Sequence, residues 1–242
     1  VETTIVEICD PSNVVTITEP GENSNLYRPY VIKAEYTCST FGFKGQDYFG
    51  KASLGLELCQ NKAAEHEFWT GEMAQLDETL DGEDLPNTNR YLASPDAEDV
   101  TPTPGTAVKP AFGQALLEQA LADCGCGARG YIHATRSVAS ILPVKDEDGM
   151  LQTKLGTYVI AGTGYDGSGP DGTQPGGTET WMYATGPVTA RLGKVAVTPE
   201  TLSEATDVRN NSVSVMASRE AAVTWDGCCH FAVLVDLSLD YS

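Results

Sequence analysis

The sequence predicts an α+β fold, in which a few helices are segregated from several antiparallel strands. Only two long segments, 46–70 and 111–124, repeat apolar residues every three to four positions, as amphipathic helices do. Most other apolar residues alternate with polar ones or form short runs bounded by turn-forming residues, as strands do. The two kinds of segment do not alternate regularly along the chain, which favours α+β over a parallel βαβ fold.

Segment 46–70 predicts one long helix. Leu54 and Leu58 are expected to widen its apolar stripe. Gly71 is its predicted end, because glycine readily adopts the left-handed backbone with which many helices stop. The stripe itself consists of Phe49, Ala52, Leu56, Cys59, Ala63 and one of His66 and Glu67.

The remaining segments complete the predicted order. The second helix, 111–124, places Phe112 and Leu116 on its apolar side, and a third, short helix is predicted at 137–142. The glycines and prolines of segment 162–177 predict an exposed loop whose ends are anchored and whose middle is free. Strands are predicted at 3–9, 28–43, 131–133, 154–161, 180–183, 188–197, 212–225 and 230–239. Loops and turns are predicted at 10–27, 75–89, 94–110, 145–150 and 206–211.

Composition limits the classes of function. The 242 residues suit one large domain or two coupled subdomains with a sizeable core. A formal net charge of -19 argues against a basic nucleic-acid groove, because phosphate binding needs clustered lysine and arginine. No apolar run approaches the roughly 18 residues of a membrane-spanning helix, so no membrane contact is predicted. Residues 1–4 carry no targeting signal, and Val1 is compatible with loss of an initiator methionine or of a longer leader.

The cysteines predict packing residues rather than cross-links or metal ligands. There are seven, irregularly spaced, and two pairs are too close for ordinary disulfides, so reduced thiols in a cytoplasm are expected, including Cys9, Cys38 and Cys59. The alternative is a zinc site, because thiolates and imidazoles are suitable ligands. Its C-x-C and C-C-H spacings are not those of zinc knuckles, so we predict thiols that pack as small apolar side chains. The candidate zinc ligands are Cys124, Cys126, Cys228, Cys229 and His230.

Two glycine-rich motifs have functional alternatives. Residues 125–130 match G-x-G-x-x-G, but a predicted helix precedes them and a predicted strand follows, the reverse of the order that nucleotide binding requires. We therefore predict a helix-ending turn there. Residues 166–172 place oxygen ligands at alternating positions, as calcium loops do, yet lack the terminal bidentate glutamate. An exposed loop is predicted instead.

No catalytic constellation is apparent among the titratable residues. His66, His133 and His230 have no serine or cysteine nearby in a nucleophile context, so structural roles are predicted for all three. The carboxylates lie mostly in loops and form no evident acid–base pair. The sequence therefore predicts no catalytic, cofactor-binding or metal-binding residues, no cofactor, and a protein that is not an enzyme.

Between residues 28 and 239, several segments follow one another in a distinctive order. The long helix ends in an alanine- and glutamate-rich stretch, followed by Phe68, Trp69, a small residue and Gly71. The later segments are 111–124, 130–133, 137–142, 155–159, 181–186 and the pair Arg219 and Glu220 before the closing strands. This order resembles that of the major capsid proteins of tailed bacteriophages of the Hong Kong 97 type, whose long "spine" helix ends in a similar way.

The resemblance implies a Hong Kong 97-like fold (HK97-like) with a peripheral and an axial subdomain. Residues 1–45 would form a short N-terminal arm and extended loop, and residues 46–106 the spine helix and peripheral subdomain. Residues 107–211 would form the axial subdomain, and residues 212–242 the C-terminal strands that return to the peripheral one.

The implied function is structural. Copies of the chain would form hexamers and pentamers of an icosahedral shell around double-stranded DNA, in a virion assembled in the host bacterial cytoplasm. The implied partners are the chain itself, decoration, scaffolding or portal proteins, and packaged DNA, which an acidic inner surface would contact weakly and non-specifically.

Other classes of protein stay open. A nanocompartment shell of the encapsulin kind would use the same fold to enclose an enzyme, and a minor head component would differ from a major one in copy number. A small-molecule enzyme with segment 162–177 as a lid would be a defined monomer or dimer whose melting temperature responds to a ligand.

Overall fold

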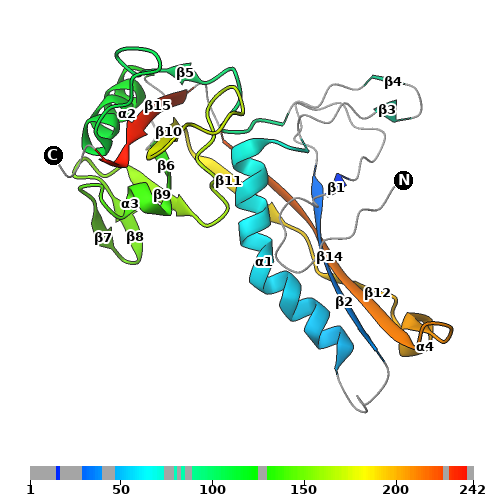
Figure 1. The fold of residues 1–242 in the computed structure, drawn as a ribbon. Helices are drawn as coiled ribbons and strands as arrows, with labels where there is room; N and C mark the ends of the chain where they lie inside the picture. The colour runs from blue at the N-terminus through cyan, green and yellow to red at the C-terminus, as the bar shows by residue number, and fades with distance from the viewer. Residues whose placement is uncertain are drawn as a thin grey trace.

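A computed structural model describes residues 29–39, 47–73, 89–124, 130–225 and 229–238, together with three short strands, β1 (Val15–Thr16), β3 (Thr79–Leu80) and β4 (Glu83–Asp84). The described chain has two lobes (Figure 1). The elongated lobe contains a long helix on a six-stranded sheet, and the compact lobe contains a seven-stranded sheet with two helices. The α+β class predicted from the sequence is confirmed. No helix within the described ranges is both long and apolar enough to cross a bilayer.

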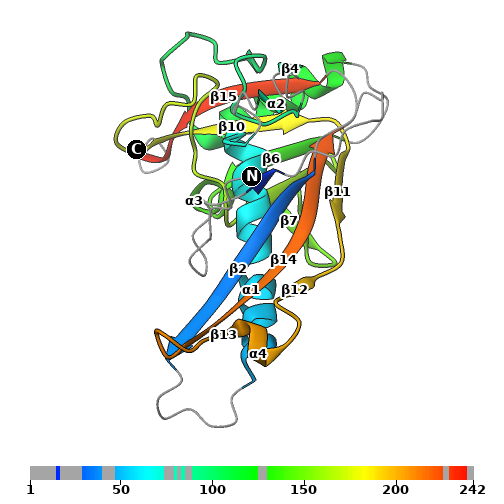
Figure 2. The ribbon, with the colours of Figure 1, turned by 90° about the vertical axis from the view of Figure 1, so that its right-hand side faces the viewer.

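The elongated lobe is built on a long antiparallel pair of strands. β2 (Tyr30–Ser39) pairs with β14 (Ser212–Trp225) along its whole length. At about 3.3 Å per residue, the 14 residues of β14 extend about 46 Å. β1 pairs with β2 on one side, and three short strands pair with β14 on the other. These are β11 (Val188–Leu192), β12 (Ala196–Thr198) and β13 (Thr206–Asp207), with the short helix α4 (Leu202–Ala205) before β13 at the far end of the lobe (Figure 2).

Helix α1 (Tyr48–Thr70) covers one face of this sheet and confirms the long helix predicted at 46–70. Its 23 residues span about 34 Å at 1.5 Å per residue, so it runs along most of β2 (Figures 1 and 2). The carboxylate of Asp47 accepts a hydrogen bond from the Gly50 amide (2.8 Å) and caps the first turn. Gly71 ends the helix as predicted, with φ of 62°, and a Cβ there would lie 2.2 Å from the Tyr91 ring.

The buried side of α1 is narrower than the predicted stripe. The sequence placed Leu54 and Leu58 on that stripe, but their side chains are 53% and 72% exposed. Each is two residues from Leu56 and so lies about 200° around the helix from it. The predicted residues that are buried are Ala52, Leu56, Cys59, Ala63 and Glu67.

The strand order of the compact lobe is β5–β15–β10–β6–β9–β8–β7. β6 and β9 are parallel, as are β5 and β15, and the other neighbours are antiparallel. The strands are β5 (Glu98–Asp99), β6 (Tyr131–Thr135), β7 (Lys145–Glu147), β8 (Met150–Gln152), β9 (Tyr158–Gly162), β10 (Glu179–Thr185) and β15 (His230–Asp236).

Helices α2 (Pro110–Cys124) and α3 (Arg136–Ala139) pack on this sheet. Gly113 lets α2 approach β15 closely, since a Cβ at that position would lie 2.6 Å from a Val235 methyl group. The sequence placed Phe112 on the apolar side of this helix, but its ring is half exposed. The buried side of α2 is formed instead by Pro110, Gly113, Gln114 and Leu117.

Residues 145–150 form a β-hairpin rather than the predicted charged turn. β7 and β8 pair with each other, and only Asp148 and Gly149 lie between them. Both have positive φ, 55° and 81°, which is the backbone that a tight two-residue hairpin requires. The sequence did not predict these strands because the segment is charged, and because its short strands are mostly exposed and have no apolar alternation.

The strand pairing differs from the subdomain division expected from the sequence. That division placed 107–211 in one subdomain and 212–242 in the other. In the structure, β11, β12 and β13 pair with β14 in the elongated lobe, whereas β15 pairs with β10 in the compact lobe. The chain therefore crosses between the lobes after β10 and again after β14.

The two lobes meet in an aromatic core at the C-terminal end of α1. The Trp69 ring is fully buried, with its centroid 4.7 Å from that of Tyr165 and 5.0 Å from that of Tyr183. Phe68 packs edge-on against Trp225 of β14 at 5.5 Å. This cluster, which we call the junction core, joins α1 and β14 of the elongated lobe to β10 of the compact lobe.

The first half of segment 162–177 completes the junction core. Trp69 Nε1 donates to the carbonyl and the hydroxyl of Ser168 (3.2 and 3.1 Å), and the Tyr183 hydroxyl donates to the same carbonyl (2.9 Å). The Glu65 carboxylate accepts from the Gly164 amide at 3.0 Å. The prediction that the middle of this loop is free of contacts is therefore wrong for residues 164–169, whereas residues 171–178 are largely exposed.

Candidate functional site

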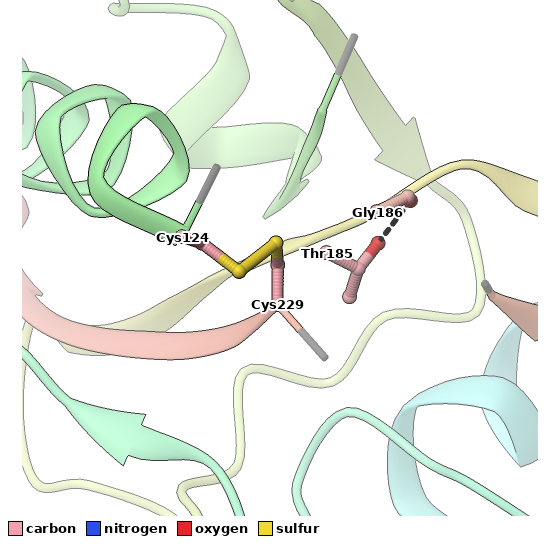
Figure 3. The surroundings of a disulfide bond; sticks show 4 residues. All are labelled: Cys124, Thr185, Gly186 and Cys229. Carbon is pink, nitrogen blue, oxygen red and sulfur yellow. Dashed lines mark hydrogen bonds between the residues drawn. A yellow bond between two sulfur atoms is a disulfide. The ribbon is translucent and has the colours of Figure 1, made fainter. Parts of the chain in front are cut away.

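Two of the cysteines proposed as alternative zinc ligands form a disulfide. Cys124 at the end of α2 is bonded to Cys229, just before β15, with the Cα atoms 5.9 Å apart (Figure 3). Cys59 is disulfide-bonded as well. The prediction of reduced thiols is wrong for these residues. Cys126 and Cys228 lie outside the described ranges.

The sequence could not indicate this pairing because its partners are 105 residues apart. The prediction compared only the close pairs, 124 with 126 and 228 with 229. Packing of α2 against β15 brings together one cysteine from each pair, and the bond closes a loop that contains most of the compact lobe.

We predict that reduction of this disulfide lowers the stability of the chain. Closing a loop of about 100 residues restricts the unfolded chain, and disulfides typically contribute ~2–4 kcal/mol. A Cys124→Ser, Cys229→Ser double variant should unfold at a lower denaturant concentration than the wild type in oxidising buffer. An unchanged midpoint, together with a free-thiol assay that finds Cys124 already reduced in the folded wild type, would contradict the bond.

The residues of the calcium-like motif use their oxygens within the chain. Asp166 Oδ1 accepts from the amide and the hydroxyl of Ser168 (2.9 and 2.7 Å), and Asp171 Oδ1 accepts in the same way from Thr173. These are local turns of the backbone. Among the described residues, no group of three or more His, Cys, Asp and Glu side chains is placed to hold a metal ion. Most of the G-x-G-x-x-G motif, 125–129, lies outside the described residues.

The histidines lie in three different settings. His133 is fully buried, with Nδ1 3.0 Å from the Tyr165 hydroxyl and Nε2 2.9 Å from the Thr185 hydroxyl. Burial, with a smaller effect of His230, lowers the pKa of His133 to about 3, so its imidazole is neutral at neutral pH. Burial also lowers the pKa of His230, whose Nε2 lies 2.9 Å from the Leu92 carbonyl oxygen. His66 sits at the rim of the junction core, between the Gly164 carbonyl and Glu72.

A groove of about 770 Å³ lies between α3, the β7–β8 hairpin and β9. Its lining is mainly apolar, with the stacked rings of Tyr131 and Tyr158 and the guanidinium of Arg136. No carboxylate, imidazole or thiol is among the residues that line it. It therefore offers no acid–base pair and no nucleophile activated by a base.

The distinctive surface feature is a set of large apolar side chains that are exposed in pairs. Leu54 and Leu58 are one helical turn apart on the outer side of α1, where their neighbours are polar. Leu192 and Val195 lie at the edge of the elongated lobe where β11 and β12 pair with β14. Leu202 and Val208 lie further along the same edge. The others, on the compact lobe, are Phe112, Met150 and Leu155. Neighbouring exposed apolar side chains such as Leu54 and Leu58 are candidate contacts with other molecules.

Arg219 holds the edge of the elongated lobe in place. Its guanidinium donates to the Gly193 carbonyl between β11 and β12 (3.0 and 2.6 Å) and to the Gln60 side chain of α1 (2.6 Å). The Gly193 amide donates in turn to the Glu220 carbonyl (2.8 Å). The surface of β11 and β12 is therefore fixed relative to α1. In the sequence, Arg219 stands out only as part of the order of segments shared with a family, and no local pattern indicates the edge itself.

Comparison with solved structures finds shell proteins. A holo-SrpI encapsulin complex from Synechococcus elongatus shares 12% identity, with 96% of this chain and 83% of that chain covered and a TM-score of 0.45. The capsid of Ralstonia phage GP4 shares 10% identity, with 92% and 81% covered and a TM-score of 0.47. No protein-family model matches the sequence, and neither does any curated protein sequence. A virus-like particle from Pyrococcus furiosus is similar at 11% identity, with 96% and 89% covered and a TM-score of 0.41.

Proposed function

We propose that the chain is the repeating subunit of an icosahedral shell, the head of a tailed bacteriophage that encloses double-stranded DNA. The observation that supports this most strongly is the distribution of exposed apolar side chains over α1, the edge of the elongated lobe and the compact lobe. A dimer with one two-fold interface needs one such surface, whereas a closed shell needs several different contacts per subunit. The predicted order of elements, with its long spine helix, supports the same proposal.

The two-lobed shape supports a role in assembly rather than in catalysis. The junction core fixes the angle between the lobes, so the contacts on each lobe have a defined relative direction. A shell needs this property, because small errors in subunit geometry accumulate around a closed particle. The neutral, buried His133 and the groove without acidic or basic catalysts point away from an enzyme.

The net charge of the chain bears on what the proposed shell encloses. A chain of net charge -19 repels DNA at most of its surface, which suits a container that later releases its contents. An encapsulin-like nanocompartment would have the same subunit contacts but would enclose protein. A minor head component would assemble only together with a different shell subunit.

Sedimentation velocity of the purified chain, over a range of protein and salt concentrations, tests assembly. We expect a rapidly sedimenting species of uniform size at the higher concentrations. Particles purified from the source should retain nuclease-resistant DNA, as measured by absorbance at 260 and 280 nm after nuclease treatment. Uniform particles that contain a second protein and no nucleic acid would support the nanocompartment instead. A chain that sediments only as a monomer under every condition would contradict the proposed function.

A further inference from the structure

The free edge of the elongated lobe combines exposed strand, apolar side chains and positive charge. β11 is the last strand of its sheet on this side among the described strands, and its residues from Thr189 to Leu192 are exposed. An edge strand presents unpaired backbone N–H and C=O groups, to which another strand can add. Leu192 and Val195 are exposed here and offer apolar contact to such a strand.

The charge of this edge is opposite to that of the whole chain. Residues 188–197 contain Arg191 and Lys194 and no aspartate or glutamate, in a chain of net charge -19. Both side chains are exposed, and neither forms an ion pair with a described residue. The edge, which we call the basic edge, thus carries two exposed positive charges beside its apolar side chains, with one carboxylate, that of Glu220, next to Gly193.

One segment of the same chain has the complementary properties. Residues 77–84 read Asp-Glu-Thr-Leu-Asp-Gly-Glu-Asp, with five carboxylates around Leu80. No lysine or arginine occurs between Lys62 and Arg90. The described part of the segment is the antiparallel pair β3 and β4, which form a separate two-stranded sheet that is not joined to β11 in the same chain.

We propose that the acidic hairpin β3–β4 of a second copy docks against the basic edge and adds a strand beside β11. The inference rests on the proposed function, because it names one of the contacts by which shell subunits meet. Two basic edges would repel each other, so an edge-to-edge pair is disfavoured, whereas hairpin and edge attract. The attraction would be between the acidic sequence of residues 77–84 and the exposed Arg191 and Lys194.

Charge exchange between the two surfaces tests the contact. We expect an Arg191→Glu, Lys194→Glu variant to give about tenfold fewer shells or less, because like charges at an interface suppress pairing. A Glu78→Lys, Asp81→Lys, Glu83→Lys, Asp84→Lys variant, which makes the hairpin segment net positive, should show a similar loss. The combination of these four changes with Arg191→Glu and Lys194→Glu should restore shell yield to near the wild-type value. The control, Arg136→Glu on an exposed site of the compact lobe, should assemble normally.

Cross-linking gives a second readout that does not depend on complete shells. A zero-length carbodiimide reagent, applied to a mixture of ¹⁴N- and ¹⁵N-labelled chains, should join Lys194 to a carboxylate of residues 77–84 in mixed-isotope peptides. Shells formed at wild-type yield by Arg191→Glu, Lys194→Glu, or Lys194 cross-links that map only to other segments, would overturn this inference and leave the proposed function standing. A wild-type chain that stays monomeric and yields no mixed-isotope cross-link would overturn both.

Discussion

Replacing Leu56 with aspartate is expected to prevent both folding and assembly. Leu56 is 1% exposed and packs in the core between α1 and the sheet, which also contains Ala52, Val215 and Ala217. An unpaired carboxylate at this position would lose its hydration without gaining a partner, at a cost of several kcal/mol. Because whole domains are stable by only about 5–15 kcal/mol, that cost is a large fraction of the total.

The matched control for this change is Leu58→Asp, on the same helix. Its side chain is 72% exposed, so the substitution should leave the free energy of unfolding within about 0.5 kcal/mol of the wild-type value. It should nevertheless reduce assembly if the outer side of α1 meets another subunit. Circular dichroism with chemical denaturation measures the first effect, and sedimentation measures the second. A Leu56→Asp protein that unfolds at the wild-type midpoint would show that this face of α1 is assigned wrongly.

Replacing Trp69 with alanine is expected to cost about 3–5 kcal/mol, because it leaves a large cavity in the junction core. The change removes ring contacts to Tyr165 and Tyr183 and the hydrogen bonds to Ser168, so segment 162–177 loses its attachment to α1. We therefore expect lower stability and also particles of irregular size or shape, since the angle between the lobes is no longer fixed.

Trp69→Phe separates these effects, because it keeps a ring in the junction core but removes the indole donor. The Ser168 carbonyl still accepts from Tyr183, so the loss should be only about 1 kcal/mol. Denaturant unfolding measures the stability of each variant, and electron microscopy measures particle uniformity. Uniform particles and wild-type stability from Trp69→Ala would mean that the junction core does not hold the lobes together.

Elements with a strong local period were predictable from the sequence. The bounds of α1 and its stop at Gly71 follow from helical spacing and from the left-handed backbone that glycine tolerates. β2, β14 and β15 follow from alternation and from short apolar runs. In each case the local pattern indicates the element, and packing of its apolar face against the rest of the fold stabilises it.

The exposed apolar residues could not be identified in this way. Leu54, Leu58 and Phe112 lie next to buried stripes in the sequence, and the residue type does not show whether a leucine faces the solvent or the core. Periodicity therefore placed them on the core-facing side. Their exposure became visible only once the direction of each helix face was set by the strands beneath it.

Contacts between distant segments were also beyond local reasoning. The glycines of segment 162–177 indicated a loop, but the same glycines also permit close packing: a Cβ at Gly164 would lie 2.1 Å from the Lys62 carbonyl on α1. The disulfide joins residues 105 positions apart, and β14 and β15, although consecutive, belong to different sheets. The first of these features depends on how the two lobes pack together, and the other two depend on tertiary pairing that no local pattern indicates.

Negative-stain electron microscopy of the purified chain, at concentrations where sedimentation detects large species, tests the central claim most directly. The proposal predicts closed shells of uniform diameter built from one polypeptide, with hexagonal and pentagonal clusters of subunits in class averages. Fields that contain only single two-lobed molecules, or open and irregular aggregates at every protein and salt concentration, would contradict the proposal that this chain is a shell subunit.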